Sequence, residues 1–357
     1  MKTQLRTSTA TVVSRGRSTF RTLVPAVLLA LSPQSVAGTD LADVYRDIQA
    51  GQQLTAEDVA NLEDVLLADP YATEARVRLI GYHWQRIWGN DDSRRRHSDL
   101  TLWMVRNSPR HALFEMAYGR IDRQTSPESF QQTREAWLAH LEAQPEDPVL
   151  LGNAADFLLM EDRPLAMSLL HTAQAVDPAN ADWPGKIGHL TRLGSTTQAA
   201  AAEALPHFER AYTLSDNPYA RERHLVSVVR TAYEAGRFDL ARTYASEALP
   251  VPDPERMGDL HHHAHTVLGR LALREGDVGR AGDHLLASAD TVGSPVLSSF
   301  GPNMRLAGEL LDHGEDDVVL RYLDACGEFW SDTRGRLQRW TAEIREGGKP
   351  DFDGRWR

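Results

Sequence analysis

Four histidines lie within five residues of the chain, at His261, His262, His263 and His265. On a helix, side chains four positions apart share a face, so His261 pairs with His265, and Asp259 pairs with His263 on a separate face. Each pair offers two metal ligands, whereas a zinc site uses three or four ligands held by surrounding groups. The run therefore indicates a solvated or partly packed histidine cluster, with a metal site at His261–His265 as the alternative.

The other reactive side chains do not form a recognisable catalytic set. The single cysteine, Cys326, has no histidine or aspartate that the sequence places beside it. The acidic pairs Asp91-Asp92 and Asp316-Asp317 fall where turns are expected, and carboxylates there cap helices or meet water. Neither Gly-Lys pair continues with Ser or Thr, as a phosphate-binding loop requires. We therefore expect no catalytic residue, resident metal or cofactor; an enzyme with a site assembled from distant segments is the alternative.

The first 37 residues have the composition of a secretory signal peptide. Five basic residues and no acidic residue accompany an apolar run from Thr22 to Leu31, and small residues precede a cleavage site after Ala37. The run is near half of the roughly 20 apolar residues that a membrane-spanning helix needs. We expect export to a bacterial periplasm or beyond, without a membrane anchor.

Cleavage after Ala37 would remove five of the 39 basic residues and leave 34 against 50 acidic residues, a net charge of about −16. A nucleic-acid partner is not expected, because its phosphates require a basic footprint. A single cysteine forms no internal disulfide, so stability must come from a hydrophobic core, which a chain of this length can bury.

A helical-hairpin pattern recurs along the second half of the chain. In each unit a helix ends, a Gly or polar turn follows, and a small residue opens a second helix, at Ala166, Ala204, Ala241 and Ala281, with Val319 in the weakest unit. The intervals between these positions are 38, 37, 40 and 38 residues. A methyl group at this position lets two antiparallel helices approach closely. The spacing therefore predicts stacked helical hairpins.

These hairpins resemble the tetratricopeptide repeat, whose period is 34 residues. The segment from Asp147 matches best, at Leu150, Ala154, Phe157, Ala166, Leu170, Ala173 and Pro178. From Ala72 to Trp330 the chain also resembles a set of exported bacterial repeat proteins that share the blocks RLIGY, LGNAA, SFGPNMRLA and YLDACGEFW. Both resemblances imply an all-α fold, an α-solenoid of stacked antiparallel helical hairpins, and neither supplies catalytic residues. Cys326 then falls in a second helix, as a small core residue.

We expect four segments: a signal peptide (1–37), irregular N-terminal helical hairpins (38–145), a tetratricopeptide-like array (146–345) and a flexible tail (346–357). In the N-terminal part, Ala56 to Leu67 has an apolar helical face and ends at Asp69-Pro70. Asp91 to His97 is expected to be a charged break, and Val292 to Pro302 a connection rich in Gly, Ser and Pro.

In tetratricopeptide arrays the first helices line a concave groove. The repeat frame on the units that open at Glu222 and His262 implies a ligand-binding set of Arg223, Arg230, Tyr233, His263, Arg270 and Arg274, with Thr266 on the same face. The matching positions of the unit from Asp147 are Pro148, Leu151, Ala155, Leu158 and Leu159. The resemblance thus implies a groove that is basic at one end and apolar at the other.

Such a groove suits an extended peptide or a partner helix that is acidic or ends in a carboxylate. The alternative is a set of solvated arginines paired with neighbouring acids. We therefore interpret the chain as an exported protein- or peptide-binding scaffold without catalytic activity.

Overall fold

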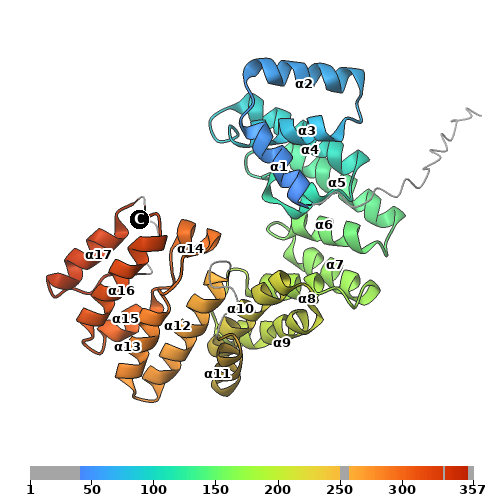
Figure 1. Cartoon of the computed structure of the whole chain (residues 1–357). Coiled ribbons are helices and arrows are strands. Elements are labelled where there is room, and N and C mark those ends of the chain that lie inside the picture. The colour runs from blue at the N-terminus through green and yellow to red at the C-terminus, as the bar shows by residue number, and fades with distance from the viewer. Residues whose placement is uncertain (1–40, 250–256, 333, 353–357) are drawn as a thin grey trace, which may run out of the picture. The chain divides into compact units, whose positions relative to one another are not determined.

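The computed structural model describes residues 41–249, 257–332 and 334–352, and every regular element in these ranges is a helix (Figure 1). The predicted all-α fold is therefore confirmed. The signal peptide predicted for residues 1–37 lies outside the described ranges. Among the helices that the structure describes, none combines the length and the apolar character that a membrane crossing requires.

The N-terminal part is a succession of helices that pack on their neighbours. They are α1 (Leu41–Gln52), α2 (Ala56–Ala68), α3 (Thr73–Trp84), α4 (Asp91–Asn107) and α5 (Pro127–Ala143), with the short 3-10 turns η1 (Ala112–Glu115) and η2 (Ala117–Gly119) before α5. Helix α3 is central, because it contacts α1, α2 and α4. Helix α2 follows the predicted bounds, and its capping box joins Thr55 and Asp58.

The charged break predicted at Asp91 to His97 is wrong, because these residues begin α4. The Asn90 side chain accepts a hydrogen bond from the Ser93 N–H at 2.9 Å and caps the helix. Asp91 pairs with Arg94 at 2.8 Å, one turn later. The charges that suggested a break therefore stabilise a helix.

From residue 148 onward the helices form hairpins of two adjacent antiparallel helices (Figure 1). The five pairs are α6 (Pro148–Leu158) with α7 (Arg163–Val176), α8 (Asp182–Arg192) with α9 (Gln198–Leu214), α10 (Pro218–Glu234) with α11 (Phe238–Glu247), α12 (Gly258–Arg274) with α13 (Val278–Ala287), and α15 (Arg305–Leu311) with α16 (Asp316–Phe329). Successive hairpins also contact each other, as α7 does α8 and α11 does α12. The stacked-hairpin architecture is that of an α-solenoid.

The small residues that defined the repeat lie where the helices approach. Ala166, Ala204, Ala241, Ala281 and Val319 are all 0% exposed. The period exceeds that of the tetratricopeptide repeat because several helices are long: α9, α10 and α12 have 17 residues each. The predicted register is therefore confirmed.

The core consists of three hydrophobic clusters that follow one another along the chain. Cys326 belongs to the last cluster with 0% exposure, and burial raises the pKa of its thiol to about 12. Cys326 is thus a neutral core residue, as predicted. A short helix, α14 (Pro295–Phe300), forms within the connection predicted at residues 292–302.

The segment after the last helix, α17 (Arg336–Arg345), is packed as far as Phe352. The ring of Phe352 meets Trp340 edge to face with centroids 5.0 Å apart, and Pro350 is buried. Lys349 forms an ion pair with Asp312. The described part of the predicted flexible tail, residues 346–352, therefore lies against the body of the protein.

We expect Gly81→Ala to destabilise the protein by about 1–3 kcal/mol, because a Cβ at Gly81 of α3 would lie 2.4 Å from the carbonyl oxygen of Ile48 in α1. The backbone of α1 must then move. Gly327→Ala in α16 is the matched control, since no atom lies within 4 Å of its added Cβ. That variant should gain about 0.5–1 kcal/mol from helix propensity. Urea unfolding of both variants tests this, and equal shifts would contradict the close approach of α1 and α3.

Candidate functional site

Helices α10 and α12 lie side by side and carry the six residues predicted to bind a ligand. Arg223, Arg230 and Tyr233 are on α10, and His263, Arg270 and Arg274 are on α12; all six are exposed or partly exposed. The neighbouring Thr266 is buried instead, and its hydroxyl donates to the His262 carbonyl oxygen at 2.8 Å. The six predicted residues are thus accessible, whereas Thr266, which the repeat frame places on the same face of α12, is not.

Four of the six side chains are engaged with neighbours: Arg223, Tyr233, Arg270 and Arg274, whose guanidinium stacks 3.7 Å from the Phe238 ring. Arg270 holds Glu309 with both its Nε and a terminal nitrogen, at 2.9 and 2.6 Å, and its guanidinium stacks 4.2 Å from the Tyr233 ring. Burial lowers the pKa of Arg270, but the hydrogen bonds and charge of Glu309 outweigh it and raise the pKa overall. The charge of Arg270 is therefore neutralised by Glu309, and its guanidinium is covered on one face by Tyr233. Arg223 pairs with Asp182 at 3.4 Å.

The apolar end predicted for the groove is wrong. Leu151, Ala155 and Leu158 of α6 are 2%, 1% and 0% exposed. Helix α6 contacts α5, α7 and η1, so these side chains lie in the first hydrophobic cluster. The repeat frame holds for the helix but does not include η1, which packs against α6.

Arg230 and His263 line a recess of about 310 Å³, which we call the C-terminal recess. Its other walls come from α14, from the loop after it, and from the C-terminal helices. They include Val296, Phe300, Gly301, Arg305, Trp330, Arg336, Trp340 and Phe352. The recess therefore combines three arginines with several aromatic rings.

Arg230 has no hydrogen-bond or ion-pair partner in the part of the chain that the structure describes. Its acidic neighbours are engaged elsewhere: Glu234 pairs with Arg192 and, at 3.6 Å, with Arg305, and Asp259 accepts a hydrogen bond from Ser294 at 2.9 Å. Desolvation lowers the pKa of Arg230 although its side chain reaches solvent, as expected for a cation in a recess. Arg230 thus has two carboxylates and two arginines as charged neighbours, and both carboxylates are bound to other residues.

His263 contributes a neutral imidazole to the recess. Desolvation, followed by the charges of His262 and Arg230, lowers the pKa of His263 well below its usual value. Its Nδ1 is buried and has no hydrogen-bond partner among the described residues. The position is therefore polar and uncharged at neutral pH.

His262, which is 0% exposed, anchors the loop that forms one wall. Its Nε2 accepts the Asn303 N–H at 2.9 Å, so its Nδ1 carries the proton and donates to the Ser288 carbonyl oxygen at 3.0 Å. In the same loop Gly301 has φ +90°, and a Cβ there would lie 2.4 Å from the Trp330 ring. The loop thus rests on Trp330 and leaves Phe300 78% exposed.

Sequence reasoning missed this wall, although its residues belong to the conspicuous blocks SFGPNMRLA and YLDACGEFW. The available signal was an aromatic residue directly before Gly-Pro, in a connection between two hairpins. Phe300 is the last residue of the short helix α14, and its ring is left 78% exposed.

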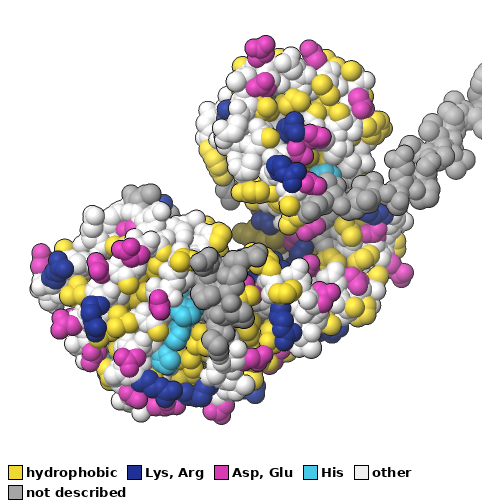
Figure 2. All heavy atoms as spheres, in the orientation of Figure 1, with side chains coloured by type: hydrophobic (Ala, Val, Ile, Leu, Met, Phe, Trp, Pro, Cys, Tyr) yellow, Lys and Arg dark blue, Asp and Glu magenta, His cyan; other side chains and the backbone are white. Residues whose placement is uncertain are grey.

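The histidine cluster joins α12 to α13. The Nε2 of His261 lies 2.7 Å from the Ala287 carbonyl oxygen, and the Nδ1 of His265 lies 3.0 Å from the Nδ1 of His284. Histidine side chains form a strip over the position of these helices in Figure 2. Within the described ranges, no three His, Cys, Asp or Glu side chains are arranged to hold a metal ion.

Comparisons with known proteins assign no family to the chain. No protein-family model matches the chain, and no curated protein matches it. Among solved structures it is similar to the crystal structure of PilW, a widely conserved type IV pilus biogenesis factor. The sequences are 14% identical, the TM-score is 0.39, and the match covers 68% of this chain and 97% of PilW. A similarity at this level assigns no partner and no process to the chain.

We expect the protein to lose stability as the pH falls from 7 to 5. Burial lowers the pKa of His262 from 6.5 to about 4, so the unfolded chain takes up the proton first and folding becomes less favourable as the pH falls through this window. A single such histidine contributes on the order of 1–2 kcal/mol over the window. Urea unfolding at pH 7 and 5 measures the loss, which His262→Gln should reduce and His313→Gln, at an exposed position, should leave unchanged. An equal loss in both variants would contradict the assignment.

Proposed function

We propose that this chain is an exported protein-binding scaffold whose C-terminal recess holds an acidic or carboxylate-terminated peptide segment. The array of helical hairpins supports a binding role, because such arrays present side chains of several helices to one partner. The composition of residues 1–37 supports export to the periplasm or beyond.

The observation that carries the proposal is Arg230, an accessible arginine without an ionic partner among the described residues, in a recess with aromatic walls. A guanidinium binds a carboxylate through two parallel hydrogen bonds, and this binding is stronger where water is partly excluded. Arg305, 42% exposed in its side chain and paired with Glu234 only at 3.6 Å, supplies a second positive charge. An acidic segment would therefore place negative charge beside Arg230 and Arg305.

The aromatic wall gives the partner an apolar contact as well. Phe300 and Val296 are 78% and 51% exposed, and both line the recess. Exposed aromatic rings beside unpaired arginines are typical of the central contacts of protein interfaces. We therefore expect a peptide with an apolar residue next to its carboxylate.

We further propose that the chain is not an enzyme and needs no cofactor. General acid-base catalysis uses two titratable groups with separated pKa values in one cleft. Among the described residues, the walls of the C-terminal recess offer arginines and a neutral histidine and include no carboxylate. This composition favours binding of an anion over its chemical conversion.

We expect Arg230→Glu to weaken the binding of acidic peptides at least about tenfold, because the reversed charge repels the carboxylate and removes a charge-assisted hydrogen bond. Fluorescence anisotropy with labelled peptides that end in an apolar residue and a carboxylate measures the affinity. Phe300→Ser should weaken the same peptides through the lost apolar area.

Arg223→Glu is the matched control: it makes the same change on the same helix at a residue outside the recess. Its affinity should stay close to that of the wild type, and amidated peptides should bind weakly to all variants. Equal effects of the Arg223 and Arg230 variants would point to a diffuse charge effect. If Arg230→Glu left the affinity of every acidic peptide unchanged, the recess would not be the binding site.

A further inference from the structure

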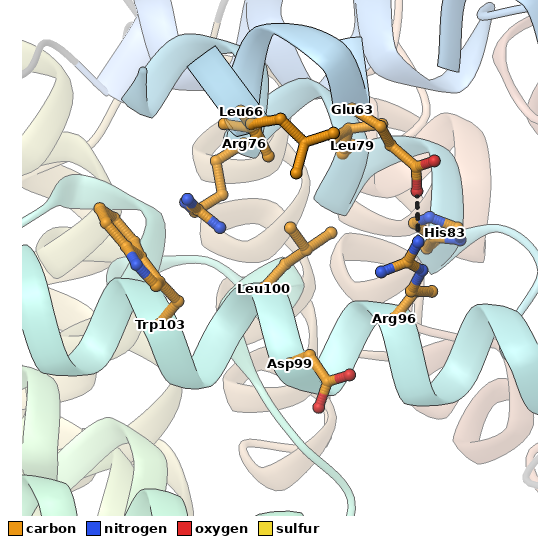
Figure 3. Close-up of a pocket in the computed structure, with 10 residues that line it drawn as sticks. Glu63, Leu66, Arg76, Leu79, His83, Arg96, Asp99, Leu100 and Trp103 are labelled. Carbon is orange, nitrogen blue, oxygen red and sulfur yellow. Dashed lines mark hydrogen bonds and ion pairs between the residues drawn. The ribbon is translucent and has the colours of Figure 1, made fainter. Parts of the chain in front are cut away.

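A second cavity, the N-terminal pocket, lies between α2, α3 and α4 and has a volume of about 400 Å³. Leucines form much of its wall: Leu66 and Leu67 from α2, Leu79 from α3, and Leu100 from α4. Figure 3 shows Arg76 and Trp103 at one side of the pocket and the ion pair of Glu63 with Arg96 at the other. This size is within the range of small-molecule sites, which are mostly apolar with a few polar groups.

Arg76 is a buried cation, 6% exposed, that has no carboxylate partner within the described ranges. One terminal nitrogen donates to the Pro70 carbonyl oxygen at 2.7 Å, and the guanidinium stacks 3.6 Å from the Trp103 ring. Its Nε is buried without a hydrogen-bond partner. A buried charge is costly unless an opposite charge accompanies it, so an anion bound beside Arg76 would be stabilised there.

The other polar groups of the pocket do not supply that anion. Glu63 is bound to Arg96 at 2.8 Å, and the carboxylate of Asp99 points away from Arg76 in Figure 3. The Nδ1 of His83 lies within hydrogen-bond distance of the Ser93 hydroxyl, at 3.3 Å. Burial lowers the pKa of His83 to about 4, so its ring is neutral at pH 7. The unmatched charge in the pocket is therefore that of Arg76.

Helix α2 covers the pocket without becoming part of the core. None of its residues is buried, and Leu67, which lines the pocket, is 81% exposed. The capping box of Thr55 and Asp58 holds the helix at its start. Leu66 and Leu67 thus present apolar area that the folded chain leaves uncovered.

We propose that the N-terminal pocket binds a free aliphatic monocarboxylate, with its carboxylate on Arg76 and its chain between Leu66, Leu67, Leu79 and Leu100. The guanidinium provides the charge, and the leucines of α2, α3 and α4 provide the apolar wall. A free acid fits better than a peptide end, because a peptide also brings polar backbone groups that the leucines of the wall cannot bond. The site is separate from the C-terminal recess and does not depend on the function proposed there.

The test uses the protein from Leu41 to its C-terminus. The probe is decanoate, at concentrations below its critical micelle concentration. Isothermal titration calorimetry should show saturable binding of decanoate. Decanol, which has the chain without the charge, and acetate, which has the charge without the chain, should bind at least about tenfold more weakly. Decanol binding as tightly as decanoate would overturn the role of Arg76.

Arg76→Met keeps the apolar stem and removes the charge. We expect at least about tenfold weaker decanoate binding and an unliganded melting temperature no lower than that of the wild type, since an unpaired buried charge is removed. A variant with unchanged affinity, or one that folds with a lowered melting temperature, would assign Arg76 a structural role and overturn the proposal.

Two surface variants test whether decanoate binds in the N-terminal pocket even if Arg76→Met does not fold. Leu67→Glu introduces a carboxylate at the mouth of the pocket and should weaken decanoate binding, whereas Val65→Glu, exposed on the same helix and outside the pocket, should not. Equal affinities of these two variants, or tighter binding of a leucine-terminated peptide than of decanoate, would overturn the assignment to a free acid.

Discussion

The close approach of helices at small residues is the constraint on which the rest of the structure depends. Four alanines and one valine, spaced by about 38 residues, are fully buried in the second helices of hairpins whose two helices contact each other. A larger side chain there would separate the helices and misplace every hairpin that follows, because each one packs mainly on its neighbours. Glycines act similarly between elements: Gly81 admits the backbone of α1, and Gly301 admits the ring of Trp330. Both candidate binding sites lie beside such contacts.

Buried histidines complete this framework with polar contacts. His262 fixes the loop of Asn303 to the end of α13, and His97 bonds to the Tyr118 carbonyl oxygen at 2.8 Å. Burial lowers the pKa of each to about 4, so these bonds are made by neutral rings. A neutral imidazole can donate at one nitrogen and accept at the other, which suits a junction between a loop and two helices. The run of histidines thus joins elements of the fold and supports the wall of the C-terminal recess.

The acidic chain distributes its arginines unevenly. Arg270 is closed by Glu309, whereas Arg230 and Arg76 have no carboxylate bound in the described residues. Their pKa shifts follow this difference: desolvation lowers the pKa of Arg230 and Arg76, and Glu309 reverses its effect on Arg270. An arginine on these helices is therefore either held in an ion pair or able to bind a ligand, depending on whether the fold places a carboxylate beside it. Arg230 and Arg76 are the basis of the two proposed sites.

The sequence by itself determined the helical hairpins, their register and the exposed face of α10, because these follow from local periodicity and from small residues at a fixed spacing. It also placed Cys326 in the core. Only the tertiary structure decided that Arg270 is paired with Glu309, 39 residues away, that α6 is buried among α5, α7 and η1, and that Phe300 lines a recess with Arg230. These contacts join residues far apart in the chain. Periodicity describes one helix at a time, whereas the charge and the exposed surface of a site depend on which helices meet.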